Sequence, residues 1–122
     1  MTRRSCTWLL ITAIVVTLAL FRVPPVQIAV EGGRIEPAYV RFRVRVEPHP
    51  DNRGLSVQLY EGDFLVSSSW EDLHGENSAA TRWVPRQGAY ALGGGDYLVE
   101  AHVSRQGQAN WYGATRFRVI GR

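Results

Sequence analysis

The fold is decided by one alternating stretch, Tyr39-Val40-Arg41-Phe42-Arg43-Val44-Arg45-Val46-Glu47. Its apolar residues recur at every second position, and arginines occupy the positions between them. Successive side chains of a β-strand point to opposite faces, so this period of two predicts a strand with one face in a core and the other in solvent. The stretch therefore predicts a sheet that is covered on one face, which is typical of antiparallel proteins.

Similar strands are expected further along the chain, separated by turn-forming segments such as 48–54, 61–63 and 106–108. A short strand over 81–84 is expected to carry Trp83 into the core and to end at Pro85, and residues 71–78 are expected to form a loop. The alternation predicts the following inward residues, strand by strand: Leu55, Val57 and Leu59; Phe64, Val66 and Trp70; Tyr97, Val99, Ala101 and Val103; Thr115, Phe117 and Val119.

Six or seven short strands at regular spacing, with no amphipathic helix between them, predict an all-β fold. A segment of roughly 90 residues matches the size of a seven-strand sandwich. We therefore expect residues 34–121 to form one antiparallel β-sandwich of about seven strands. No oligomeric state follows from the sequence.

The N-terminus has the pattern of an export signal, since Arg3 and Arg4 precede an apolar run over residues 6–21 that ends at Arg22. As a helix this run would span about 24 Å, short of the roughly 30 Å hydrocarbon core of a bilayer. Residues 1–22 are therefore expected to be either a cleaved signal peptide or an N-terminal membrane anchor. Either outcome places the following domain on the periplasmic or extracellular face.

A linker is expected over residues 23–33. Pro24 and Pro25 cannot continue a helix, and Gly32 and Gly33 interrupt the chain again before the expected start of the domain.

The net charge of +3 belongs to the N-terminal segment rather than to the domain. Three of the 14 basic residues are Arg3, Arg4 and Arg22, which leaves 11 arginines beside the 11 acidic residues, all of which lie within 31–122. A nucleic-acid partner is therefore not expected. The single cysteine, Cys6, lies in the apolar run, so the domain has no thiol for disulfide or nucleophilic chemistry.

The segment that contains Leu92, Gly95 and Tyr97 resembles the corner before the sixth strand of immunoglobulin-like, fibronectin type III and carboxypeptidase-regulatory-like domains. In those domains a tyrosine hydroxyl bonds back to the upstream backbone and closes the turn. The resemblance implies that Tyr97 is structural. The paired cysteines of antibody domains are absent. The segments 43–48, 51–53, 62–64 and 67–68 also resemble a group of exported bacterial proteins without assigned activity.

Neither an active site nor a metal or cofactor site is expected. The sequence has no Gly-x-Ser-x-Gly elbow, His-Glu-x-x-His helix or phosphate loop, and its Ser67–Ser69 run near Asp72 and His74 lacks triad spacing. Surface positions and turn chemistry explain the residues that could serve as metal ligands better than a metal site does; these residues are His49, Asp51, Asn52, Glu61, Asp63, His74, Glu76, Asp96 and His102.

Aromatic residues are the candidate ligand-binding groups, because planar rings on a sandwich surface stack on sugars or on partner side chains. The candidates are Trp70, Trp111 and Tyr112. A basic stripe is a further possibility if the strand with Arg41, Arg43 and Arg45 neighbours the one with Arg116 and Arg118; the alternative is a solvated sheet face.

The expected function is a non-catalytic binding or structural module of the cell envelope, whose partner is an envelope protein or a glycan. Residues 6–21 would contact the membrane if they are retained. Two alternatives stay open, namely a carbohydrate-binding module that uses exposed aromatic rings and an accessory domain of an envelope enzyme.

Overall fold

The computed structural model describes residues 23–75 and 80–122, and within these ranges the chain forms eight β-strands. The expected N-terminal helix lies in residues 1–22, outside the described residues. Among the residues described, no helix is long and apolar enough to cross a bilayer. The strands are β1 (Val26–Gly32), β2 (Ala38–Val46), β3 (Asn52–Glu61), β4 (Phe64–Asp72), β5 (Thr81–Val84), β6 (Tyr90–Leu92), β7 (Gly95–Arg105) and β8 (Trp111–Val119).

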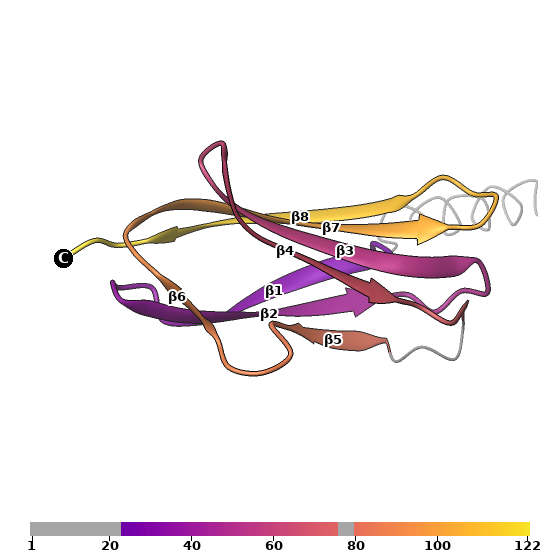
Figure 1. Ribbon diagram of the computed structural model, residues 1–122, viewed down its shortest axis with the longest axis horizontal. Helices are drawn as coiled ribbons and strands as arrows, with labels where there is room; N and C mark the ends of the chain where they lie inside the picture. The colour runs from indigo at the N-terminus through magenta and orange to yellow at the C-terminus, as the bar shows by residue number, and fades with distance from the viewer. Residues whose placement is uncertain (1–22, 76–79) are drawn as a thin grey trace, which may run out of the picture.

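The strands form two antiparallel sheets. In the first sheet β2 lies between β1 and β5, and β6 pairs with β2 beyond the end of β5. In the second sheet the order is β4-β3-β7-β8. The two sheets lie as two layers along the long axis of the molecule (Figure 1).

The core lies between the layers, and the alternating stretch in β2 contributes to it as predicted. Val40, Phe42 and Val44 are completely buried, whereas the arginines between them lie on the outer face. The inward residues predicted for β3 and β7 are buried as well. Phe42 packs against the rings of Tyr90 and Phe117, with ring centroids 5.8 and 5.7 Å away, so the first sheet contacts the second near the centre of the core.

Polar contacts join the two sheets along both sides of the sandwich. On one side β1 approaches β8, where the Thr115 hydroxyl donates to the Ile28 carbonyl oxygen at 3.2 Å. On the other side the Arg82 guanidinium of β5 binds the Glu71 carboxylate of β4, with 2.8 Å between Nε and Oε1. Both of these side chains are mostly buried, so this ion pair holds the edge strands of the two layers together.

The expected linker over residues 23–33 is wrong over most of its length, because residues 26–32 form β1. This strand and the short strand β6 join the six strands located in the sequence, so the described residues form eight strands where about seven were expected. Pairing between β1 and β2 runs from Val26 opposite Val46 to Gly32 opposite Val40. The sequence does contain a signal for β1, because Val26, Ile28 and Val30 alternate with other residues. The proline pair before them and the glycine pair after them favoured a linker instead.

The inward face predicted for β4 is also wrong. Ser67 and Ser69 lie opposite the buried Leu59 and Val57, and residues directly opposite each other in a sheet share a face. Trp70 consequently points outward, opposite Ser56, and Phe64 and Val66, which lie at or beyond the β-bulge, are exposed as well. A β-bulge beside Leu59 shifts the register within this strand pair, and β4 continues to Asp72, into the segment expected to be a loop.

Trp83 lies outside the core, contrary to expectation, although β5 has the predicted bounds. Trp83 is opposite Arg43 on β2, so it shares the outer face of the arginines, while the next residue, Val84, is opposite the buried Phe42. The Arg41 guanidinium stacks on the Trp83 ring at 4.3 Å from the centroid. The indole therefore covers an arginine rather than filling the core.

Candidate functional site

Two of the three candidate aromatic residues lie on the outer face of the second sheet. Trp70 is on β4 and Tyr112 is on β8, the two edge strands, and their side chains are 62% and 52% exposed. The register places them in one row across the sheet, in which Trp70 is opposite Ser56, Ser56 is opposite His102, and His102 is opposite Tyr112. Three interstrand steps of about 4.8 Å separate the edge strands by roughly 14 Å.

Trp70 lies directly over the backbone of the neighbouring strand. A Cβ atom on Gly54 would fall 2.2 Å from Cζ2 of the indole, so only glycine leaves room for the ring at this place. The indole Nε1 donates a hydrogen bond to Asp72 Oδ1 at 3.2 Å. These two contacts position an exposed ring on the surface of the sheet.

Tyr112 is positioned by its neighbours on β7. Its hydroxyl donates to Glu100 Oε1 at 3.2 Å, and its ring lies against the His102 imidazole with 4.9 Å between centroids. Partial burial against the sheet, together with the hydrogen bond to Glu100, raises the pKa of Tyr112. The hydroxyl therefore remains a donor at neutral pH.

Polar side chains fill the surface between the two rings. Ser56, Gln58, Glu100 and His102 point outward from β3 and β7, and the Gln58 amide bonds to the Ser56 hydroxyl. We call the surface formed by Ser56, Gln58, Trp70, Glu100, His102 and Tyr112 the aromatic platform. Sequence reasoning missed its polar members as a group, although each occupies an outward position in a correctly predicted alternating strand.

Trp111 does not belong to the platform. It precedes Tyr112 on β8, so it points to the other face of the sheet, where it packs against the core. The Arg105 guanidinium stacks on its ring at 4.0 Å, and the His49 ring meets it edge-on at 5.8 Å. The structure therefore separates Trp111 from Trp70 and Tyr112.

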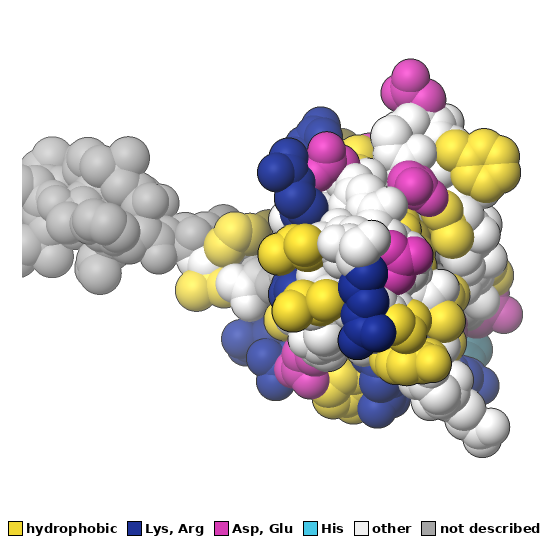
Figure 2. All heavy atoms as spheres, turned by 90° about the vertical axis from the view of Figure 1, so that its left-hand side faces the viewer, with side chains coloured by type: hydrophobic (Ala, Val, Ile, Leu, Met, Phe, Trp, Pro, Cys, Tyr) yellow, Lys and Arg dark blue, Asp and Glu magenta, His cyan; other side chains and the backbone are white. Residues whose placement is uncertain are grey.

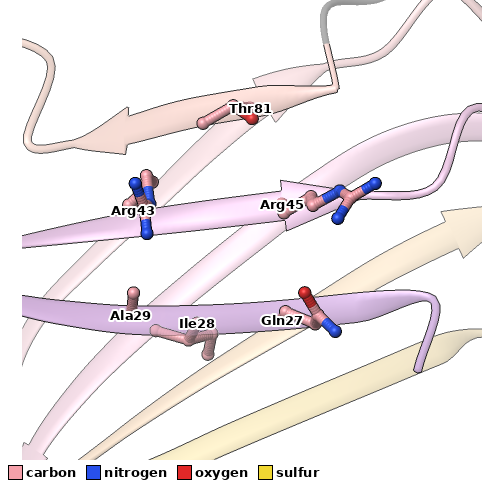
Figure 3. A pocket seen from close by; sticks show the side chains of 6 residues that line it. All are labelled: Gln27, Ile28, Ala29, Arg43, Arg45 and Thr81. Atoms are coloured by element: carbon pink, nitrogen blue, oxygen red, sulfur yellow. The ribbon is translucent and has the colours of Figure 1, made fainter. Parts of the chain in front are cut away.

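The arginine-bearing strands do not form a single stripe, because β2 and β8 lie in different sheets. The arginines of β2 instead line a shallow hollow on the outer face of the first sheet. Arg43 and Arg45 project into it between Thr81 of β5 and Gln27 and Ala29 of β1 (Figure 3). Arg43 is balanced by Glu31, 3.6 Å away, so the charge of this hollow is partly neutralised.

The histidines and turn carboxylates take part in ordinary structural contacts. His102 approaches Glu100 at 3.6 Å, and Asp96 pairs with Arg118 at 2.7 Å. Asn52 is buried and donates to the Glu47 carbonyl oxygen. In the described part of the chain, no three His, Cys, Asp or Glu side chains are grouped so that they could hold a metal ion.

Tyr97 has the geometry of a tyrosine corner. Its buried ring stacks on Phe117 at 5.2 Å between centroids, and its hydroxyl donates to the Gly93 carbonyl oxygen at 2.7 Å. Leu92 is buried beside this turn, and a side chain at Gly95 would come within 2.8 Å of the Glu61 carboxylate. Burial, with smaller contributions from Glu61 and Glu36, raises the pKa of Tyr97.

Two facing antiparallel sheets with this strand order define an immunoglobulin-like β-sandwich, the architecture that fibronectin type III domains share. No protein-family model matches the chain, and no curated protein matches it. Among solved structures, the chain is similar to the fibronectin type III domain of the human collagen alpha-1(XX) chain, with 16% identity and a TM-score of 0.47. The similarity covers 83% of this chain and 84% of that domain.

Proposed function

We propose that this protein is a non-catalytic binding module of the cell envelope and that the aromatic platform binds a glycan. The observation that carries the proposal is the placement of two exposed rings, Trp70 and Tyr112, on one face of one sheet, with a polar surface between them. Solvent-exposed aromatic residues that are held in place by their neighbours are typical of recognition surfaces.

The chemistry of the platform suits a saccharide chain. Each sugar ring has apolar C–H groups on its faces, which stack on aromatic rings, and hydroxyl groups at its rim, which need donors and acceptors. Trp70 and Tyr112 supply the rings, and Ser56, Gln58 and Glu100 supply the polar groups. Because the rings stand roughly 14 Å apart, the ligand would be an extended chain of several sugars rather than a monosaccharide.

Retention of the purified protein on insoluble glycans tests this proposal, followed by calorimetric titration with oligosaccharides from the glycan that is retained. Peptidoglycan sacculi, chitin and cellulose form the first panel. We expect Trp70→Ala and Tyr112→Ala each to weaken binding about tenfold or more, as is typical of central aromatic contacts.

Tyr39→Ala is the matched control, because Tyr39 is 62% exposed but lies on the first sheet, and it should leave the affinity unchanged. Gly54→Ala is a second test, because its methyl group would displace the Trp70 ring without removing it. Equal binding by wild type, Trp70→Ala and Tyr112→Ala would show that the platform is not the glycan site.

The envelope location is part of the proposal and is supported by the N-terminal sequence pattern of Arg3, Arg4 and an apolar run over residues 6–21. The sandwich begins at Val26, only a few residues after this run. Cell fractionation and the intact mass of the isolated protein test the location. A membrane-bound chain of full length supports an anchor, and a shortened chain outside the membrane supports cleavage. Recovery of the full-length chain from the cytoplasm would refute export.

A further inference from the structure

The outer face of the first sheet has a surface of its own, the shallow hollow of Figure 3, which we call the arginine hollow. Three adjacent strands line it, with β2 in the middle and β1 and β5 on its two sides. The lining residues are Gln27, Ile28, Ala29, Arg43, Arg45 and Thr81. The aromatic platform lies on the other sheet, so the proposed glycan site does not use this hollow.

The strand register brings three polar side chains of the hollow into one row. Gln27 lies opposite Arg45, and Arg45 lies opposite Thr81. Because neighbouring strands are about 4.8 Å apart, these three groups span roughly 10 Å across the sheet. Arg43 is on the same face of β2, about 7 Å along the strand from Arg45. Its neighbour on β1 is Ala29, whose small side chain leaves room beside the guanidinium group.

The hollow contains an arginine that no acidic side chain neutralises. In the part of the chain that the structure describes, Arg45 forms no ion pair, whereas Arg43 pairs with Glu31 at 3.6 Å. Both side chains of that pair are about half exposed, and an exposed ion pair of this kind is weak. Glu47, the next acidic residue after Arg45, lines a different hollow, beside Trp111. The lining of the arginine hollow is therefore positively charged.

This arrangement differs from the rest of the charged surface. Figure 2 faces the opposite end of the sandwich, where basic and acidic side chains lie next to one another. Arg118, for example, is 2.7 Å from Asp96, so a carboxylate already binds its guanidinium group. Arg45 instead lies between two uncharged polar neighbours, and its guanidinium group is available to an anion from outside the chain.

We propose that the arginine hollow binds a phosphate group. Guanidinium groups form paired, charge-assisted hydrogen bonds with phosphate and with carboxylate. A planar carboxylate has two oxygens, which one guanidinium group satisfies, whereas the oxygens of a phosphate point in several directions. The Gln27 amide, the Thr81 hydroxyl and the Arg43 guanidinium group can donate to the oxygens that Arg45 leaves free. Donors from three strands therefore suit a tetrahedral anion better than a planar one.

The position of the hollow favours a lipid headgroup as the source of the phosphate. Gln27 is the second residue of β1 and follows Arg22, which ends the apolar run, by five residues. Five extended residues reach about 17 Å at most. If residues 6–21 stay in a bilayer, the hollow would therefore lie close to the lipid phosphates. This source rests on the proposed envelope location, whereas the phosphate site itself does not.

Nuclear magnetic resonance titration of the full-length chain, in an uncharged detergent without phosphate, tests the site. The probe is glycerol phosphate at constant ionic strength, and the backbone amides of Gln27, Arg43 and Thr81 report binding. We expect Arg45→Gln to weaken binding about tenfold or more, because a charged hydrogen-bond donor is lost. Acetate, a planar anion, should bind about tenfold more weakly than glycerol phosphate.

Arg116→Gln is the matched control. It removes the same charge from an exposed position on β8, in the other sheet, so it should bind glycerol phosphate as wild type does. Circular dichroism confirms that each variant is folded. The proposal is overturned if glycerol phosphate shifts none of the reporting amides, if Arg45→Gln and Arg116→Gln weaken binding equally, or if acetate binds as tightly as glycerol phosphate.

A second titration distinguishes the two sources of phosphate. Phosphatidylglycerol is added to the detergent micelles in place of glycerol phosphate, and it should shift the same amides in wild type and not in Arg45→Gln. If glycerol phosphate shifts these amides and phosphatidylglycerol does not, the site binds a soluble phosphate and the lipid source is wrong. Glycan retention by Arg45→Gln should equal that of wild type, so the phosphate site and the glycan site can fail separately.

Discussion

At the scale of single residues, two glycines position two aromatic side chains. Gly54 leaves the space into which the Trp70 indole fits, and the Gly93 carbonyl oxygen accepts the hydrogen bond of Tyr97. The first contact positions an exposed ring on the surface of the sheet, and the second closes a turn. An aromatic ring is therefore held on the surface at one position and buried in a turn at the other.

Replacement of Tyr97 by phenylalanine is expected to destabilise the fold by about 1–2 kcal/mol. The ring would keep its contact with Phe117, but the Gly93 carbonyl oxygen would lose its partner at a buried corner. Urea denaturation measures the change. Tyr112→Phe is the control, because Tyr112 is exposed. Removing its hydroxyl should lower the free energy of unfolding by less than about 0.5 kcal/mol. Equal stabilities of the two variants would contradict a structural role for the Tyr97 hydroxyl.

At the scale of strands, β1 and β8 belong to different sheets and approach each other closely. Gly113 of β8 permits this approach, since a Cβ atom there would lie 2.8 Å from the backbone carbonyl oxygen of Val26. Thr115, the next residue on the same face of β8, donates a hydrogen bond to the Ile28 carbonyl oxygen. The side of the sandwich is therefore closed by backbone contact that requires a residue without a side chain.

Gly113→Ala should consequently lower the free energy of unfolding by about 1–3 kcal/mol, because a strand backbone cannot move aside as a flexible side chain can. Thermal and urea denaturation measure the effect. Gly33→Ala is a suitable comparison, since its nearest neighbouring atom would be 3.8 Å from the added methyl group. If Gly113→Ala is as stable as Gly33→Ala, the contact between β1 and β8 is looser than the structure indicates.

At the scale of the whole molecule, the burial of Tyr97 makes the free energy of unfolding depend on pH. Burial raises the pKa of Tyr97 in the folded state, whereas in the unfolded chain this hydroxyl titrates near its usual value of about 10. Above that value the unfolded chain releases a proton that the folded chain retains. The contribution of Tyr97 to the free energy of unfolding is therefore fully present below about pH 10. It is lost as the pH rises through the pKa of Tyr97 in the folded state.

We expect the free energy of unfolding to fall in alkaline solution above about pH 10, by at most about 1.4 kcal/mol per pH unit from this one group. Urea denaturation at a series of pH values measures the slope. Tyr97→Phe should be less stable at neutral pH but should show a smaller alkaline loss than wild type. An unchanged alkaline slope in Tyr97→Phe would assign the loss to other groups.

The sequence by itself determined the strands whose one face is buried. Val40, Phe42 and Val44 in β2, and Val99, Ala101 and Val103 in β7, alternate with polar residues over a full strand, and this local period is sufficient to predict both the strand and its inward face. The tyrosine corner was also visible, because its residues lie within a few positions of one another.

Only the tertiary structure decided what depends on pairing between distant segments. The face of β4 follows from Ser67 and Ser69 lying opposite buried residues of β3, and Trp83 lies outside because it is opposite Arg43. The aromatic platform likewise requires four strands to align Trp70 with Tyr112, although the two residues are far apart in the chain. Alternation specifies that a strand has two faces, but contacts across the sheet specify which residues meet on each face.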